Sequence, residues 1–226
     1  MARKKLKVVM LGEGRVGKTS LLHRFVHNSF DEECPSTTKA TMYANTKVEV
    51  GETTADVSVW DTAGQERYHA LGPIYYRDAH GAVLAYDITD KDSFDKVKVW
   101  LKELHQVVGE NINVVVVGNK CDLERERKVV KKEAEEWAAA HGAQHFLCSA
   151  KLGIRVADAF TALVTAIVKS LGTASGVQAG TGNGANAGAY NGGRPASSNQ
   201  RSKGVKIAPD EGPAREAPPE KKDCSC

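Results

Sequence analysis

Residues 12–19 read GEGRVGKT, and they separate two segments that differ in the spacing of their apolar residues. The run before them, residues 6–11, is short and almost wholly apolar, which is typical of a buried strand. After them, Leu21, Leu22 and Phe25 recur at the spacing of one helix face. The eight residues fit G-x-x-x-x-G-K-[ST], a loop whose backbone N–H groups surround phosphates at the start of a helix. The sequence therefore predicts a strand, a phosphate-binding loop and a helix in that order.

The residue types in this loop suit a nucleoside polyphosphate and its metal ion. Glycines let the backbone approach the phosphates closely. Lys18 would place a cation between the outer phosphates, and the Thr19 hydroxyl would bind Mg²⁺. A glycine-rich turn that matches the pattern by chance is the alternative, and the strand and helix on either side disfavour it. The residues expected to contact the phosphates or the metal are Gly14, Arg15, Val16, Gly17, Lys18, Thr19 and Ser20.

Strand and helix patterns alternate along the chain as far as residue 171. Residues 48–50 and 57–60 alternate apolar and polar side chains around a glycine turn, which predicts an antiparallel hairpin. Further strands are expected at residues 81–86, 113–117 and 145–147, and helices at residues 94–108, 131–140 and 156–168. Such alternation predicts an α/β fold in three layers, with helices on both faces of a mostly parallel sheet. In that architecture ligands bind beyond the carboxyl ends of the strands.

The composition limits the classes of protein to consider. The chain has 226 residues with 26% charged residues and a formal net charge of +3, too small to indicate nucleic acid as the main partner. Five widely scattered cysteines favour free thiols over a disulfide framework. From residue 172 onward Gly, Ala, Asn, Ser and Pro dominate, so we expect a globular domain over residues 1–171 and a flexible tether over residues 172–226.

A second motif follows the predicted strand that ends at Trp60. Residues 61–66 read DTAGQE. Asp61, at a strand end facing the phosphate loop, would hold Mg²⁺, and the N–H of Gly64 could approach a terminal phosphate. Gln65 has both a donor and an acceptor and could orient an attacking water. Taken alone, this segment could equally be a polar loop.

Two further segments suggest which base is bound. Residues 119–122 read NKCD after a strand, and a carboxylate at Asp122 could accept two hydrogen bonds from guanine that adenine cannot donate. Asn119 would tie the base-binding loops together, and the stem of Lys120 would cover the ring. After the last strand, Ser149, Ala150 and Lys151 could present a backbone N–H to the guanine oxygen. Because four such signals occur in order at strand ends, chance is a poor explanation.

Two other functions stay open on the residues alone. One is a phosphate-loop phosphotransferase acting on a small metabolite, for which ATP would compete at the site. The other is a nucleotide-bound scaffold that never hydrolyses its nucleotide. Assays of ATP competition and of turnover separate both from a guanine-nucleotide switch.

These motifs resemble the Ras superfamily of small GTPases over residues 5–171, and the runs WDTAGQERY at 60–68, YYR at 75–77 and YDIT at 86–89 resemble its Rab branch. Residues 69–78 are most similar to an early-endosomal Rab. The resemblance implies a six-stranded sheet with five helices, bound GTP or GDP with Mg²⁺, and hydrolysis of GTP in which Lys18 and Gln65 are catalytic. Since no arginine stands out as an internal finger, we expect slow turnover that an activating protein accelerates.

The resemblance also assigns residues outside the motifs. Phe30 should pack near the base or ribose, and the aromatic triad read by Rab effectors corresponds to Tyr43, Trp60 and Tyr75. The resemblance implies that a loop around residues 35–42, the first switch, changes shape with the nucleotide, and this loop departs from the Rab pattern. Counting back from Trp60 selects Thr38 as the ligand of Mg²⁺ and of the terminal phosphate, whereas counting forward from Phe30 selects Thr37; we choose Thr38.

The chain ends in Cys224-Ser225-Cys226, which resembles the Rab ending that receives two geranylgeranyl groups. Two lipid chains anchor a protein stably where one binds only marginally. Two unmodified exposed thiols are the alternative. By the resemblance, the partners are an exchange factor, a GTPase-activating protein, a Rab escort protein with geranylgeranyl transferase, a GDP-dissociation inhibitor and effectors, with no nucleic acid. The protein would be a monomer that cycles between the cytosol and the cytoplasmic face of endosomal or other endomembranes.

Overall fold

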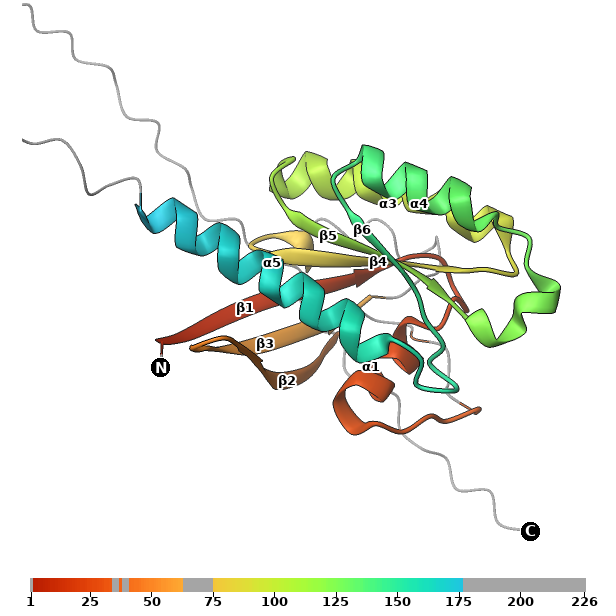
Figure 1. Ribbon diagram of the computed structural model, residues 1–226, viewed down its shortest axis with the longest axis horizontal. Coiled ribbons are helices and arrows are strands. Elements are labelled where there is room, and N and C mark those ends of the chain that lie inside the picture. Colours follow the sequence, from red (N-terminus) through yellow and green to blue (C-terminus); the bar gives the residue numbers. More distant parts are fainter. Residues whose placement is uncertain (1, 34–36, 38–40, 63–74, 177–226) are drawn as a thin grey trace, which may run out of the picture. The chain divides into compact units, whose positions relative to one another are not determined.

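The computed structural model describes residues 2–33, 37, 41–62 and 75–176 (Figure 1). Its sheet has six strands in the order β2-β3-β1-β4-β5-β6, and β2 alone runs antiparallel to its neighbour. The predicted hairpin is therefore β2 with β3. The strands are β1 (Ala2–Leu11), β2 (Thr41–Val50), β3 (Thr53–Asp61), β4 (Gly81–Asp87), β5 (Asn113–Asn119) and β6 (Gln144–Leu147).

Helices cover both faces of this sheet, which confirms the predicted three-layer α/β fold. Figure 1 shows α3 and α4 on one face and α5, in blue-green, on the other, where α1 also packs. A short 3₁₀ helix, η2, follows β5. The helices of the described residues are α1 (Lys18–His27), α3 (Lys91–Val108), η2 (Cys121–Glu126), α4 (Lys131–Ala140) and α5 (Val156–Gly176).

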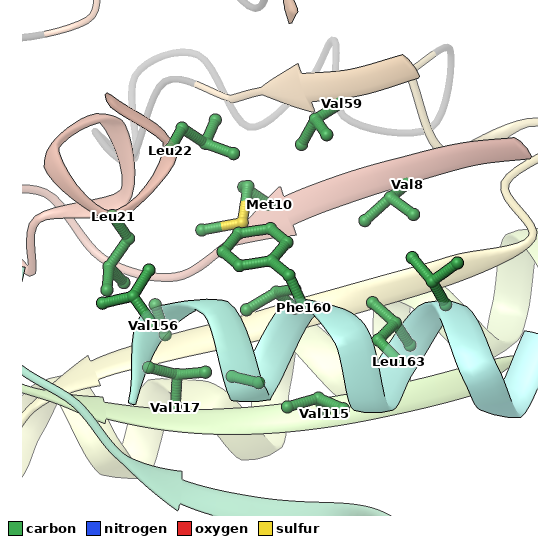
Figure 2. Packing of buried hydrophobic residues seen from close by; sticks show 14 of the residues in the cluster. Val8, Met10, Leu21, Leu22, Val59, Val115, Val117, Val156, Phe160 and Leu163 are labelled. Atoms are coloured by element: carbon green, nitrogen blue, oxygen red, sulfur yellow. The ribbon is translucent and has the colours of Figure 1, made fainter. Parts of the chain in front are cut away.

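Two apolar clusters, one on each face, hold the layers together. Between the sheet and helices α1 and α5, Phe160 lies among side chains from several strands (Figure 2) and stacks on Phe25 with the ring centroids 4.2 Å apart. On the other face, Trp100 and Leu104 of α3 pack over the central strands. All seven residues of β4 are buried, because a central parallel strand is covered on both sides. The clusters fix the strand ends, where the predicted motifs lie.

Several elements extend further than the residue patterns indicated. Helix α3 begins at Lys91 because the side chain of Asp90 accepts a hydrogen bond from the N–H of Asp92 (3.1 Å) and caps the first turn. Strand β1 reaches back to Ala2 through parallel pairing with β3. Helix α5 runs past residue 171 to Gly176, since adding a residue to a formed helix costs far less than starting one. None of the described helices combines the length and the apolar character needed to cross a membrane.

Candidate functional site

The loops that follow β1, β5 and β6 meet the end of β3 at the carboxyl edge of the sheet. The phosphate loop after β1 has the backbone that its glycines permit, with φ of 141° at Gly12 and 92° at Gly17. A Cβ atom added at Gly17 would lie 2.4 Å from Nδ2 of Asn119, so glycine is required where the base loop touches the phosphate loop. Arg15 adopts a left-handed conformation (φ 64°), which non-glycine residues rarely take. Successive N–H groups of such a turn can form a concave site for an anion.

Lys18 begins α1 and turns back over the phosphate loop. Its ammonium donates to the carbonyl oxygens of Gly12 (2.8 Å) and Glu13 (3.0 Å), and the residue is 6% exposed. Burial lowers the pKa of Lys18 to about 8, although the carboxylates of Asp61 and Glu13 partly oppose this shift. A buried cation held by neutral carbonyls favours an anionic ligand, and the phosphates of a nucleotide supply one.

Three oxygen-bearing side chains converge beside Lys18. The Thr19 hydroxyl donates to Oδ2 of Asp61 (2.5 Å), and the Thr37 hydroxyl oxygen lies 2.8 Å from that of Thr19 and 3.3 Å from the same carboxylate oxygen. Within the described part of the chain, the buried Oδ1 of Asp61 has no hydrogen-bond partner, and burial raises the pKa of this carboxyl despite the hydroxyls and Lys18 nearby. Hydroxyl and carboxylate oxygens with one orphaned buried oxygen fit Mg²⁺.

The first switch therefore reaches the phosphate loop through Thr37. Thr38, the residue that we chose from the sequence, lies outside the described residues. The contacts of Thr37 favour the alternative count, which ran forward from Phe30.

The base loops are tied to the phosphate loop by Asn119. Its Nδ2 donates to the carbonyl of Val16 (2.9 Å), and its Oδ1 accepts from the N–H of Ala150 (3.1 Å). The Ser149 hydroxyl donates to Oδ1 of Asp122 (2.5 Å) and accepts from the N–H of Leu152 (3.0 Å). One buried amide thus joins three loops, and the Ser149 hydroxyl orients the carboxylate of Asp122 beside them.

Sequence reasoning missed two partners of the base loops. The ammonium of Lys120 pairs with Oδ2 of Asp87 (2.6 Å), whose other oxygen accepts from the N–H and the hydroxyl of Thr89 (2.8 and 2.7 Å). An acidic residue at the end of the fourth strand was the available signal. The other partner is Glu32, which pairs with Lys151 at 2.7 Å; both side chains are more than half exposed, so this bridge adds little stability.

Some of the remaining predicted residues are described by the structure, and the others lie outside the described residues. Phe30 is partly buried against the cluster under α1 and α5. The rings of Trp60 and Tyr75 lie 6.3 Å apart at an interplanar angle of 40°, with the ammonium of Lys7 4.9 Å from the Trp60 ring centre. The backbone of Tyr43 is described in β2, but its side chain is not. The others lie outside the described residues: Gly64, Gln65, Cys224 and Cys226.

A strand, a phosphate-binding loop and a helix, combined with an oxygen cluster for a divalent cation, define a phosphate-loop nucleotide-binding protein. A family model described as "Ras: Ras family" matches residues 7–169, and the chain belongs to this family. Its members are GTPases, so the activity is hydrolysis of GTP to GDP and phosphate. Because the family hydrolyses GTP, it disfavours the two alternative functions left open by the sequence, a phosphotransferase of small metabolites and a scaffold that never hydrolyses its nucleotide.

Named relatives indicate the branch of the family. The chain is 48% identical to "Ras-related protein Rab-21" of Geodia cydonium over 166 residues, which are 74% of this chain and 72% of the relative. It is 49% identical to the human protein of the same name over 164 residues, 73% and 72% of the two chains. Identity to "Ras-related protein Rab-31" of Rattus norvegicus is 44% over 160 residues, 71% and 82% of the two. The similarity is that of a Rab-21-like small GTPase, and it supports a role in membrane traffic.

Proposed function

We propose that the chain is a Rab-type switch that recruits effectors to endosomal membranes while it carries GTP. The observation that carries this proposal is the cluster of Thr19, Asp61 and Thr37. It joins the phosphate loop, the end of β3 and the first switch through hydroxyl and carboxylate oxygens within 3.3 Å of one another. A loop held in this way by the metal and the terminal phosphate would be released after hydrolysis, which changes the surface offered to a partner.

In the proposed hydrolysis, water attacks the terminal phosphorus of GTP and the bond to GDP breaks, leaving GDP and phosphate. Lys18 stabilises charge on the outer phosphates, and the N–H groups of the phosphate loop add fixed dipoles. Magnesium, when bound by Thr19, Thr37 and Asp61, would neutralise further phosphate charge. Gln65 is proposed to orient the water. Turnover of the isolated chain should be slow, and an arginine from an activating protein should raise it by roughly 10³ to 10⁵.

The proposed effector surface is centred on the aromatic residues Tyr43, Trp60 and Tyr75. Trp60 and the neighbouring Tyr75 are both only partly buried, and their ring centres lie 6.3 Å apart. Aromatic side chains suit this role because they bury a large apolar area with few rotatable bonds. Attachment to the membrane is proposed to follow from two geranylgeranyl groups on Cys224 and Cys226, delivered with the escort protein and transferase.

Localisation in cells tests the proposal directly. We would compare a fluorescently tagged chain with the double variant Cys224→Ser/Cys226→Ser, scoring overlap with early-endosomal, Golgi and plasma-membrane markers. The tagged wild type should lie on endosomes, and the double variant should be cytosolic. A double variant that stays on membranes would contradict lipid anchoring, and a wild type on another membrane would contradict the endosomal assignment.

A further inference from the structure

One arginine of α1 is hydrogen-bonded to the backbone of the loop that follows β6. The guanidinium of Arg24 donates from Nε to the carbonyl of Ala150 and from Nη2 to the carbonyl of Lys151, both at 2.8 Å. Its Nη1 donates to the carbonyl of Asn28, also at 2.8 Å. A Cβ atom placed on Gly153 would lie 3.5 to 3.8 Å from atoms of the Arg24 side chain, so the loop also packs on that side chain.

The inner side of the same loop is held by the residues of the base site. The N–H of Ala150 points to Asn119, and Ser149 is bonded to Asp122. The peptide groups on either side of Ala150 are therefore fixed from opposite directions, one by Asn119 and the next by Arg24. A backbone N–H can donate to a guanine oxygen only while the loop holds this position.

We propose that Arg24 is a positioning residue for nucleotide retention, which holds the base loop in place and slows the release of GDP and GTP. The proposal rests on the guanine-binding role of this loop. Charge-assisted hydrogen bonds to carbonyls are stronger than neutral ones, and the planar fork of a guanidinium can bond two successive carbonyls at once. A lysine ammonium cannot reproduce that geometry. Because α1 also begins at Lys18, one rigid helix connects the phosphate end of the site with the base end.

A purely structural role for Arg24 is the competing explanation. Its bond to Asn28 alone would stabilise the end of α1, where Asn28 takes the left-handed conformation (φ 50°). The other two bonds reach 126 and 127 residues along the chain and contribute nothing to that helix end. If Arg24 served only the helix, its loss would lower thermal stability without a specific effect on the nucleotide.

The test measures the release of a fluorescent GDP analogue from the full chain after addition of excess GDP. Arg24→Lys and Arg24→Ala should release it about tenfold faster than the wild type. This increase in the release rate should be the same with Mg²⁺ and with EDTA, because Arg24 acts on the base loop and not on the metal. It should also be the same for a GTP analogue, which has the same base.

Two control variants separate positioning from stability. Arg155→Lys makes the same chemical change near the same loop, at an exposed arginine whose side chain pairs with Asp158 and lies over Phe146. Val97→Ala lowers stability from the opposite face of the sheet. Neither should change the release rate, even when the melting temperature of Val97→Ala falls as far as that of the Arg24 variants.

Release from the Arg24 variants at the wild-type rate would overturn the proposal, as would equal acceleration in Val97→Ala at matched stability. A wild type that fails to bind the GDP analogue would instead overturn the guanine-binding role, and the two failures are therefore distinguishable.

Discussion

We propose that single side chains decide base recognition in this protein. Asp122 is oriented by the Ser149 hydroxyl, and Asn119 fixes the N–H of Ala150 beside it. Both arrangements are partly or fully buried, where hydrogen bonds discriminate strongly because an unmatched partner is left without water. We therefore expect a few polar atoms to determine the identity of the base.

Asp122→Asn should weaken GTP binding by on the order of 10² or more, because the amide meets the guanine donors with a donor of its own. The variant should gain affinity for XTP, whose ring carries an oxygen where guanine has the amine. Competition between GTP, GDP, XTP and ATP against a fluorescent nucleotide measures this. Competition by ATP, or unchanged selectivity in the variant, would contradict guanine recognition by Asp122.

Thr37→Ala should speed release of a GTP analogue in Mg²⁺ by about tenfold, whereas Thr38→Ala should have the smaller effect, because Thr37 contacts Thr19 and Asp61. In EDTA the Thr37 effect should disappear. The measurement is the release rate of both variants with and without Mg²⁺. A larger effect of Thr38→Ala would instead favour Thr38 as the switch threonine, as counting back from Trp60 predicted.

At the scale of elements, the strands β4, β5 and β6 are joined by a polar contact inside an apolar layer. The Tyr86 hydroxyl lies 2.9 Å from Nε2 of His145, and a Cβ atom on Gly118 would lie 2.6 Å from the same hydroxyl oxygen. Glycine in β5 therefore makes room for a hydrogen bond between its two neighbouring strands. Burial lowers the pKa of His145 to about 4, although Glu135 partly opposes the shift.

This contact predicts a loss of stability in acid. An unfolded histidine has a pKa near 6.5, so between pH 6.5 and 4 the unfolded chain binds more protons than the folded one. The stability that the neutral His145 contributes is complete above pH 6.5 and is lost as the pH falls towards 4, by about 2 kcal/mol at pH 5. Urea unfolding at pH 7 and pH 5 should show this loss in the wild type and in His141→Gln, the control at an exposed histidine, but not in His145→Gln. An equal loss of stability between pH 7 and pH 5 in all three proteins would contradict the role of His145.

At the scale of the whole molecule, we expect nucleotide binding and folding to be coupled through buried charges. Lys18 and Asp61 are both buried, and Oδ1 of Asp61 has no hydrogen-bond partner among the residues that the structure describes. Burying an unsatisfied charge is unfavourable unless a ligand completes it. A ligand at about a hundred times its Kd adds about 2.7 kcal/mol to the stability of the folded state.

Asp61→Asn should therefore leave the nucleotide-free protein as stable as the wild type or more stable, because it removes a buried charge and keeps an acceptor for Thr19. With GDP and Mg²⁺, the wild type should gain several degrees in Tm and the variant much less. Thermal unfolding without nucleotide, and with GDP in Mg²⁺ or EDTA, measures both effects. Asp95→Asn, an exposed change on α3, is the control. A variant that loses stability without nucleotide yet gains as much as the wild type from GDP and Mg²⁺ would refute this coupling.

Local pattern was sufficient to predict much of the fold. Helix α4 has the predicted bounds, and β4 and β5 differ by one or two residues from the runs of apolar side chains. The spacing of apolar residues reports on the face that each element buries, and glycines and capping residues report on its ends. The order of the phosphate and base motifs along the chain likewise placed them at the edge of the sheet where the loops meet.

The amino-acid sequence by itself determined the α/β architecture, the phosphate loop and the base motif, because each depends on neighbours within a few residues. Only the tertiary structure decided that Thr37 meets Asp61, that Asp87 holds Lys120 and that Arg24 grips the loop at Ala150. These pairs are separated by 24, 33 and 126 residues. Periodicity is a local property of the chain, whereas contacts over such separations depend on how the strands pair and how the helices pack against them.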